Sequence, residues 1–232
     1  MNIIITGASK GLGKAFAKIF AAQNHTLLLC ARNQQQLTET ATEIKEEFPL
    51  ATIHYTTKDL SKKNDAIEFG NWCLQFGKPS ILINNAGQFI PGSIYNEEDG
   101  ILEKMIEINL YSAYHLTRAI LPSMIKNKEG HIFNICSIAS LKAYTNGGSY
   151  SISKYALMGF SKNLREELKP FQVKVTTVYP GAVYTDSWSN TGVEENRIME
   201  PNDIAKMVYS ASLLSPQACV EDIVLRPQLG DI

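Results

Sequence analysis

Tyr150 and Lys154 lie four residues apart in a segment, residues 150–169, whose pattern predicts a helix. Residues at this spacing share one helix face, so the phenol and the ammonium would be neighbours. A phenol with its ordinary pKa of about 10 is a poor acid at neutral pH, and a nearby ammonium lowers that pKa because it favours the phenolate. The pair could therefore exchange a proton with the oxygen of a carbonyl or an alcohol.

Ser137 follows an apolar run, residues 131–136, that predicts a buried strand. At the carboxyl end of such a strand, its hydroxyl could hydrogen-bond a substrate oxygen and stabilise developing negative charge. Taken singly, a Tyr–Lys pair is usually a packed ring beside a long cation, and a serine at a strand end is usually a turn residue or a cap. Their occurrence together, downstream of a glycine-rich turn between a predicted strand and a predicted helix, favours the catalytic interpretation.

That turn is the segment TGASKGLG, residues 6–13, which joins a predicted strand at 2–6 to a predicted helix at 11–23. Its glycines would let the backbone approach a ligand closely, and the helix N-terminus would offer free N–H groups to a pyrophosphate. An ordinary glycine-rich turn is the alternative, but the position in the first strand–helix connection favours a dinucleotide site. The predicted contacts are Gly7, Ser9, Lys10, Gly11, Leu12 and Gly13.

The second predicted strand, residues 26–31, is followed by Arg32 and Asn33 and has no carboxylate at its end. An acidic residue at this place would bind the ribose 2′-hydroxyl of NAD, whereas the planar donor fork of Arg32 suits a 2′-phosphate. Lys10 could add a second positive charge. We therefore expect NADP(H) rather than NAD(H), the alternative being that Arg32 is a solvated surface cation.

Further cofactor contacts are expected at the ends of the next two strands, residues 51–56 and 81–84. Asp59, beside Leu60, could accept a hydrogen bond from the adenine amino group, or it could equally cap the following helix, as could Ser61. Asn85, Ala86 and Gly87 close the fourth strand, where they would shape the sheet edge beside the cofactor.

The elements that must position these residues alternate as strand and helix from residue 2 onward. Strands that are apolar on both faces and separated by helices predict one α/β domain over residues 1–232, with a doubly wound parallel sheet of about seven strands. The remaining predicted strands are 173–179 and 223–225, and the remaining helices are 34–48, 65–76, 97–126 and 202–214. The helix at 97–126 is expected to be interrupted or kinked near Pro122, and the irregular stretch 181–200 is expected to form a flap over the ligand or, alternatively, a solvated loop.

Composition excludes several other classes of protein. A net charge of −1 does not suit a nucleic-acid binder that works through bulk charge. The spacing of Cys30, Cys73, Cys136 and Cys219 suits no zinc site, and we expect no metal. There is no signal-peptide pattern and no apolar run of membrane-spanning length, so we expect a soluble, cytoplasmic protein.

Over nearly its whole length the chain resembles the short-chain dehydrogenase/reductase family. The resemblance rests on TGASKGLG at 6–13, NNAG at 84–87, Asn109, Ser137, YSISK at 150–154 and Pro180-Gly181. It implies a catalytic tetrad of Asn109, Ser137, Tyr150 and Lys154. Lys154 would also bind the nicotinamide ribose and, with an oxidised nicotinamide ring, lower the pKa of Tyr150, while Asn109 would kink its helix and hold a water of a proton relay. The resemblance also implies cofactor contacts at Pro180, Gly181, Val183 and Thr185.

The resemblance leaves the substrate open. A small carbonyl or alcohol is expected, with Ile138, Tyr144 and Trp188 as candidate pocket residues, each of which could equally be packing. A 3-oxoacyl-[acyl-carrier-protein] reductase is the alternative, but the segment 221–228 lacks the glycine-rich ending usual in those members and looks more like hydroxy-acid or general carbonyl reductases. Arg118, Lys126 and Lys128 could form a carrier-protein patch, although a solvated basic face is the simpler interpretation.

Two non-enzymatic alternatives are a catalytically idle dinucleotide sensor and a structural interaction module. Both would leave the tetrad without a purpose. The resemblance further implies a homodimer or homotetramer with the helices at 97–126 and 150–169 in the interface.

Overall fold

The computed structural model describes residues 1–185 and 192–232 and contains a seven-stranded parallel sheet in the order β3-β2-β1-β4-β5-β6-β7. The fold class is as the sequence predicts. The strands are β1 (Asn2–Thr6), β2 (Thr26–Ala31), β3 (Thr52–Thr57), β4 (Pro79–Asn84), β5 (His131–Ile135), β6 (Lys174–Pro180) and β7 (Asp222–Leu225). The order reverses between β1 and β4, and the carboxyl ends at such a point are where doubly wound sheets bind ligands.

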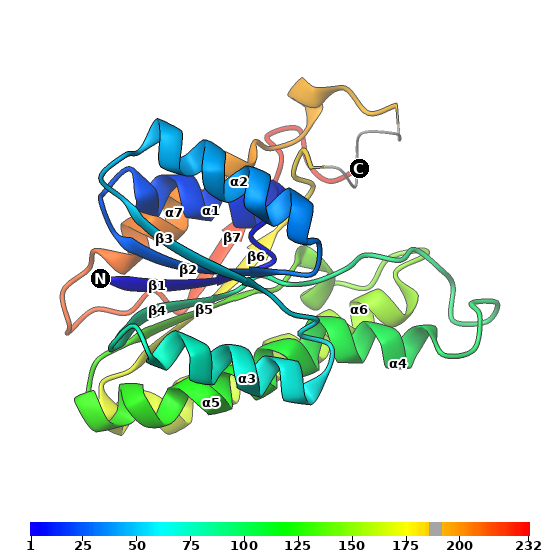
Figure 1. Cartoon of the computed structure of the whole chain (residues 1–232). Helices are drawn as coiled ribbons and strands as arrows, with labels where there is room; N and C mark the ends of the chain where they lie inside the picture. Colours follow the sequence, from blue (N-terminus) through cyan, green and yellow to red (C-terminus); the bar gives the residue numbers. More distant parts are fainter. Residues whose placement is uncertain (186–191) are drawn as a thin grey trace.

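Helices cover both faces of the sheet (Figure 1). One layer holds α1 (Gly11–Ala21), α2 (Gln34–Glu47) and α7 (Pro201–Ser212). The other holds α3 (Lys63–Leu74), α4 (Ile101–Ile106), α5 (Ser112–Asn127) and α6 (Gly148–Leu168). Short 3₁₀ segments lie at Ile138–Ser140, Lys169–Phe171 and Glu195–Arg197. No helix in the described ranges is long and apolar enough to cross a membrane.

β1 shows why the sequence folds this way. Ile3 and Ile5 pack with Phe16 of α1 on one face of the sheet, and Ile4 packs with Phe69 of α3 on the other. All five side chains are fully buried. Because apolar side chains leave both faces of the strand, β1 must lie in the middle of the sheet, and its carboxyl end delivers the glycine turn to the reversal point.

The long helix predicted at 97–126 is divided differently from the prediction. It begins at Ile101, and a π-helical segment at Glu107–Tyr111 joins α4 to α5. α5 then continues through Pro122 to Asn127, so the predicted interruption near Pro122 is wrong. Pro122 is exposed, and the helix tolerates the single backbone hydrogen bond that it loses. The irregularity lies instead at Asn109, whose side chain is held by other segments.

Candidate active site

The glycine turn between β1 and α1 is closed by contacts that exclude side chains. Gly7 and Gly11 have φ values of +63° and +52°, and a Cβ on Gly13 would lie 2.1 Å from the Gly7 carbonyl oxygen. α1 begins at Gly11, and the side chain of Lys10 does not cap it. The N–H groups of the first turn therefore have no partner within the helix and are available to an anion.

A cavity of about 880 Å³ lies along this turn. The predicted cofactor residues that line it are Gly7, Ser9, Lys10, Gly11, Leu12, Arg32, Asn33, Asp59, Leu60, Asn85, Ala86, Gly87 and Thr185. Gly13 lines neither this cavity nor the one described below, since it packs beneath Gly7 and allows the turn to close. Sequence reasoning missed several lining residues: Gln36, Lys58, Ile108 and Ser112. The position of Gln36 in the first turn of α2, next to Arg32 and Asn33, was a usable signal for one of them.

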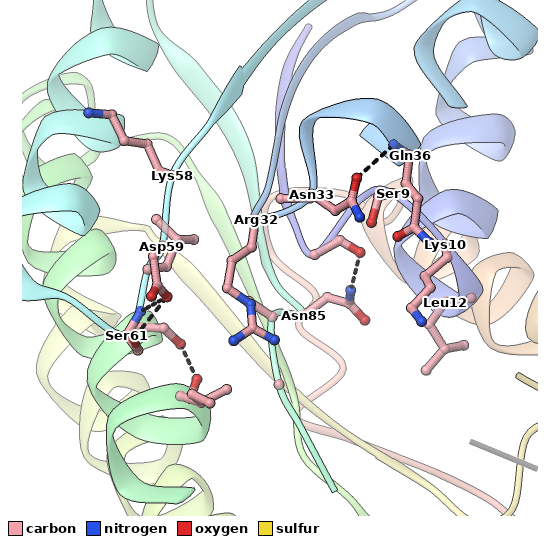
Figure 2. A pocket seen from close by; sticks show the side chains of 18 of the residues that line it. Ser9, Lys10, Leu12, Arg32, Asn33, Gln36, Lys58, Asp59, Ser61 and Asn85 are labelled. Carbon is pink, nitrogen blue, oxygen red and sulfur yellow. Dashed lines mark hydrogen bonds between the residues drawn. The ribbon is translucent and has the colours of Figure 1, made fainter. Parts of the chain in front are cut away.

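Figure 2 shows Arg32 projecting into this cavity, with Asp59 and Ser61 on one side and Lys10 on the other. Within residues 1–185 and 192–232, no carboxylate pairs with the Arg32 guanidinium. Asn33 has a structural role as well, because its side chain accepts a hydrogen bond from Gln36 N at 3.0 Å and so caps α2.

Asp59 does not cap α3, and neither does Ser61, because the residue that precedes α3 is Lys62. One carboxylate oxygen of Asp59 instead accepts the Ser61 hydroxyl at 2.8 Å, which closes a turn ahead of the helix. The capping alternative is therefore wrong for both residues. The contact with adenine stays a prediction.

Tyr150, Lys154 and Ser137 come together at the carboxyl ends of β5 and β6. Lys154 is buried, its Nζ donates to the Ile135 carbonyl at 2.9 Å, and the same nitrogen lies 5.9 Å from the centre of the Tyr150 ring. Ser137 Oγ accepts a hydrogen bond from Ala139 N at 3.1 Å, which fixes the start of the 3₁₀ segment at Ile138–Ser140. The helical spacing of the pair and the strand-end position of the serine are both as predicted.

Asn109 is fully buried and joins three parts of the chain. Its Nδ2 donates to the Gln88 carbonyl at 3.0 Å and to Ser153 Oγ at 2.9 Å, and its Oδ1 accepts from Gln88 N at 2.8 Å. A Cβ on Gly87 would lie 2.9 Å from Asn109 Oδ1 and 3.5 Å from Lys154 Nζ, so glycine alone fits there. The π-helical segment thus ties the loop after β4 to the helix that carries Tyr150 and Lys154.

Burial raises the pKa of Tyr150 to about 12, and a hydrogen bond with Ser137 opposes this rise. Burial also lowers the pKa of Lys154. The sequence argument expected Lys154 together with an oxidised nicotinamide ring to lower the pKa of Tyr150. In the protein by itself this pKa is raised, and its lowering with a bound cofactor stays a prediction. The reason for the rise is that withdrawing the phenolate from water outweighs the hydrogen bond that favours it.

A second cavity, of about 470 Å³, opens over Ser137, Tyr150 and Lys154. It shares Leu12, Asn85, Gly87 and Thr185 with the first cavity, so the two adjoin. Pro180, Gly181 and Val183, predicted as cofactor contacts, line this second cavity. The candidate pocket residues Ile138 and Tyr144 line it too, whereas Trp188 lies outside the described residues.

Residues that carried no sequence signal also line the second cavity. Arg226 and Asp231, which follow β7, form an ion pair on its wall, and the Asp231 carboxylate lies 3.5 Å from where a Cβ of Gly181 would be. Cys136 is a buried wall residue, and burial raises the pKa of its thiol to about 12. Phe89 contacts the Tyr150 ring edge-on at 4.8 Å between ring centres. Its place two residues after Gly87 was the only available hint.

Among the residues that the structure describes, no three His, Cys, Asp or Glu side chains gather in a way that could hold a metal ion.

Comparison with known proteins agrees with the geometry. The family model for short chain dehydrogenase matches residues 1–196. Sepiapterin reductase of Chlorobaculum tepidum is 33% identical over 239 residues, which cover 99% of this chain and 97% of that protein. An alcohol dehydrogenase from the archaeon Thermococcus sibiricus, solved with 5-hydroxy-NADP, superposes with a TM-score of 0.89 at 28% identity, covering 98% of this chain and 96% of its own. Serine dehydrogenase from Escherichia coli gives a TM-score of 0.86 at 26% identity and covers 100% of both chains. The chain therefore belongs to the short-chain dehydrogenase/reductase family of NAD(P)-dependent oxidoreductases.

Proposed function

We propose that this protein interconverts a small carbonyl compound and its secondary alcohol with NADP(H), through Ser137, Tyr150 and Lys154. The observation that carries the proposal is the pair of adjoining cavities. One lies along a helix N-terminus and a glycine turn, and the other opens over a phenol, a hydroxyl and an ammonium. The shared wall residues would bring a dinucleotide and a substrate into contact.

The dinucleotide cavity fits NADP(H) by the chemistry of its walls. The closed glycine turn leaves room only for backbone, and the first turn of α1 presents N–H groups to a pyrophosphate. Arg32, which has no carboxylate partner in the described parts of the chain, would bind the 2′-phosphate. When bound, the dinucleotide supplies or accepts the hydride.

The protein's own residues would transfer the proton. With a pKa of about 12, Tyr150 is protonated at neutral pH and can donate its proton to the oxygen of a carbonyl that is being reduced. Ser137 Oγ already accepts a hydrogen bond from Ala139 N, so its own proton can be donated to the same substrate oxygen. Lys154, anchored on Ile135, would contact the ribose hydroxyls, and Asn109 holds the loop after β4 against the catalytic helix.

A small molecule fits the site better than an acyl chain on a carrier protein. Lys126 and Lys128 lie at the C-terminal end of α5, just before β5 begins, and hence at the amino edge of the sheet. The cavity over Tyr150 lies at the opposite, carboxyl edge. Arg118 is already engaged, since it donates to the Tyr114 hydroxyl at 2.9 Å and lies over its ring. Lys126 and Lys128 therefore lie away from the cavity, which argues against a carrier-protein patch beside it.

We also propose that the protein forms a homo-oligomer through α5 and α6, as its family resemblance implies. The π-helical segment that precedes α5 exposes Tyr111, and α6 exposes Ile152 and Tyr155, each with about 40% of its surface accessible. A partner subunit would cover these side chains. A monomer by light scattering at micromolar concentration would contradict this assembly.

A screen of NADPH oxidation tests the function. The panel would compare 3-oxoacyl thioesters, 3-keto acids, diketones and pterins, each with and without enzyme. We expect turnover of at least one free small carbonyl. Tight NADPH binding with no turnover across the panel would favour a dinucleotide sensor. Absence of both NADPH binding and turnover would favour a structural module.

A further inference from the structure

Glu97 lies in the loop between β4 and α4, yet its carboxylate contacts the first turn of α6. Glu97 Oε1 accepts the hydroxyl proton of Ser149, and Oε2 accepts a hydrogen bond from Ser149 N at 3.4 Å. Ser149 is 1% exposed and immediately precedes Tyr150. One carboxylate therefore binds both the side chain and the backbone of the residue next to the phenol.

α6 needs this external partner because its own sequence supplies no cap. The residue before the helix is Gly147, and the first helical residue is Gly148. Gly148 has a φ of +34°, and a Cβ there would lie 2.3 Å from the Gly92 carbonyl oxygen. Gly147 thus has no side chain that could cap the helix, and at Gly148 a side chain is sterically excluded. A carboxylate at a helix N-terminus binds free N–H groups and interacts favourably with the helix dipole.

The same loop holds the segment before α6 at two further points. Gly92 N donates to the Asn146 carbonyl at 3.1 Å, and Ser93 Oγ donates to Asn146 Oδ1 at 2.7 Å. Closer to β4, the loop lines the substrate cavity through Gln88 and Phe89. The loop therefore joins the cavity wall to the start of the catalytic helix.

We propose that Glu97 is a positioning residue for the reaction: by holding Ser149, it fixes the first turn of α6 and thereby the direction of the Tyr150 hydroxyl. This inference rests on the proposed role of Tyr150. Lys154 lies one turn further into α6 and is anchored separately on Ile135, so its position does not depend on Glu97. Loss of Glu97 should therefore affect the proton-transferring group more than cofactor binding.

The test compares Glu97→Ala and Glu97→Gln with the matched control Glu98→Gln, measuring kcat, KM and the Kd for NADPH. Glu98 is exposed, and its side chain makes no hydrogen bond or ion pair in the described residues. We expect kcat to fall roughly tenfold to a hundredfold in Glu97→Ala, because small misplacements of a reacting group cost about this much, with a smaller fall in Glu97→Gln. The Kd for NADPH should stay within about twofold of wild type.

A double-mutant cycle tests whether Glu97 acts on the reaction through Ser149. In a Ser149→Ala background, Glu97→Gln should cost clearly less than in the wild type, because the contact with the hydroxyl is already lost and only the longer contact with the backbone N–H remains. Three results would each overturn the inference. The first is a kcat for the Glu97 variants equal to that of Glu98→Gln, and the second is a loss of kcat in the double mutant equal to the product of the two single losses. The third is a loss of NADPH binding as large as the loss of kcat. Full activity in Tyr150→Phe would instead overturn the proposed function itself, whatever Glu97 does.

Discussion

The walls of the two adjoining cavities come from different kinds of chain segment. The dinucleotide cavity is centred on the glycine turn of one continuous unit, β1–α1–β2, with Arg32 at its end, and residues that follow β3 and β4 complete its wall. The catalytic cavity is formed by side chains from segments far apart in the sequence, and hydrogen bonds such as Asn109–Gln88 and Glu97–Ser149 hold them together. A backbone site is set by where glycine must be, whereas a side-chain site depends on many long-range contacts. Substitutions should therefore act differently on the two halves.

The largest effect is expected in the catalytic half. Tyr150→Phe keeps the ring that packs against Phe89 but removes the hydroxyl proposed to transfer the proton, so kcat should fall by about 10³-fold or more. The Kd for NADPH, measured by fluorescence titration, should be unchanged. Near-normal turnover would show that another group transfers the proton and would contradict the role proposed for Tyr150.

The pH dependence should be the next largest effect, and its sign follows from the raised pKa of Tyr150. Below about pH 12 the phenol keeps its proton, so carbonyl reduction should change little between pH 7 and 9.5. Alcohol oxidation needs the phenolate, whose fraction rises about tenfold for each pH unit below the pKa, so its rate should rise by that factor. The measurement is kcat in both directions across this range. A midpoint near pH 7 would instead show that Lys154 and the bound cofactor overcome the effect of burial.

A smaller and more selective effect is expected in the dinucleotide half. Arg32→Gln should raise the KM for NADPH by about tenfold to a hundredfold and leave the KM for NADH within about twofold, because the guanidinium would bind only the 2′-phosphate. Lys63→Gln, a nearby surface cation that lines neither cavity, is the control. Equal losses with both dinucleotides would remove the role given to Arg32.

The sequence predicts the dinucleotide half well because its determinants are local. The glycine spacing, the strand before it and the helix after it occupy 20 consecutive residues, β1 to α1, that fold as one unit. Tyr150 and Lys154 could be predicted equally well, because i, i+4 spacing is a local property of a helix. Ser137 was found because it directly follows a predicted strand.

The remainder of the catalytic half depends on contacts between distant segments. Asn109 alone looks like an ordinary helical residue, and only the family resemblance pointed to it. Its partner Gln88 is 21 residues away, and Ser149 is 52 residues from Glu97. Arg226 and Asp231 reach the cavity because β7 ends beside β6, a pairing that no local pattern encodes. The effect of burial on the pKa of Tyr150 likewise required the packed structure.

Cys136 gives the catalytic cavity a chemical property of its own. A thiol in the wall of this cavity could add to an electrophile and trap it covalently, but only the thiolate attacks efficiently. With a pKa of about 12, the fraction of Cys136 present as thiolate at pH 7 is on the order of 10⁻⁵. Diketones and related electrophiles that enter the cavity should therefore add only slowly to Cys136 to form a hemithioketal. Cys136 should accordingly resist reactive carbonyl compounds that modify ionised thiols in other proteins.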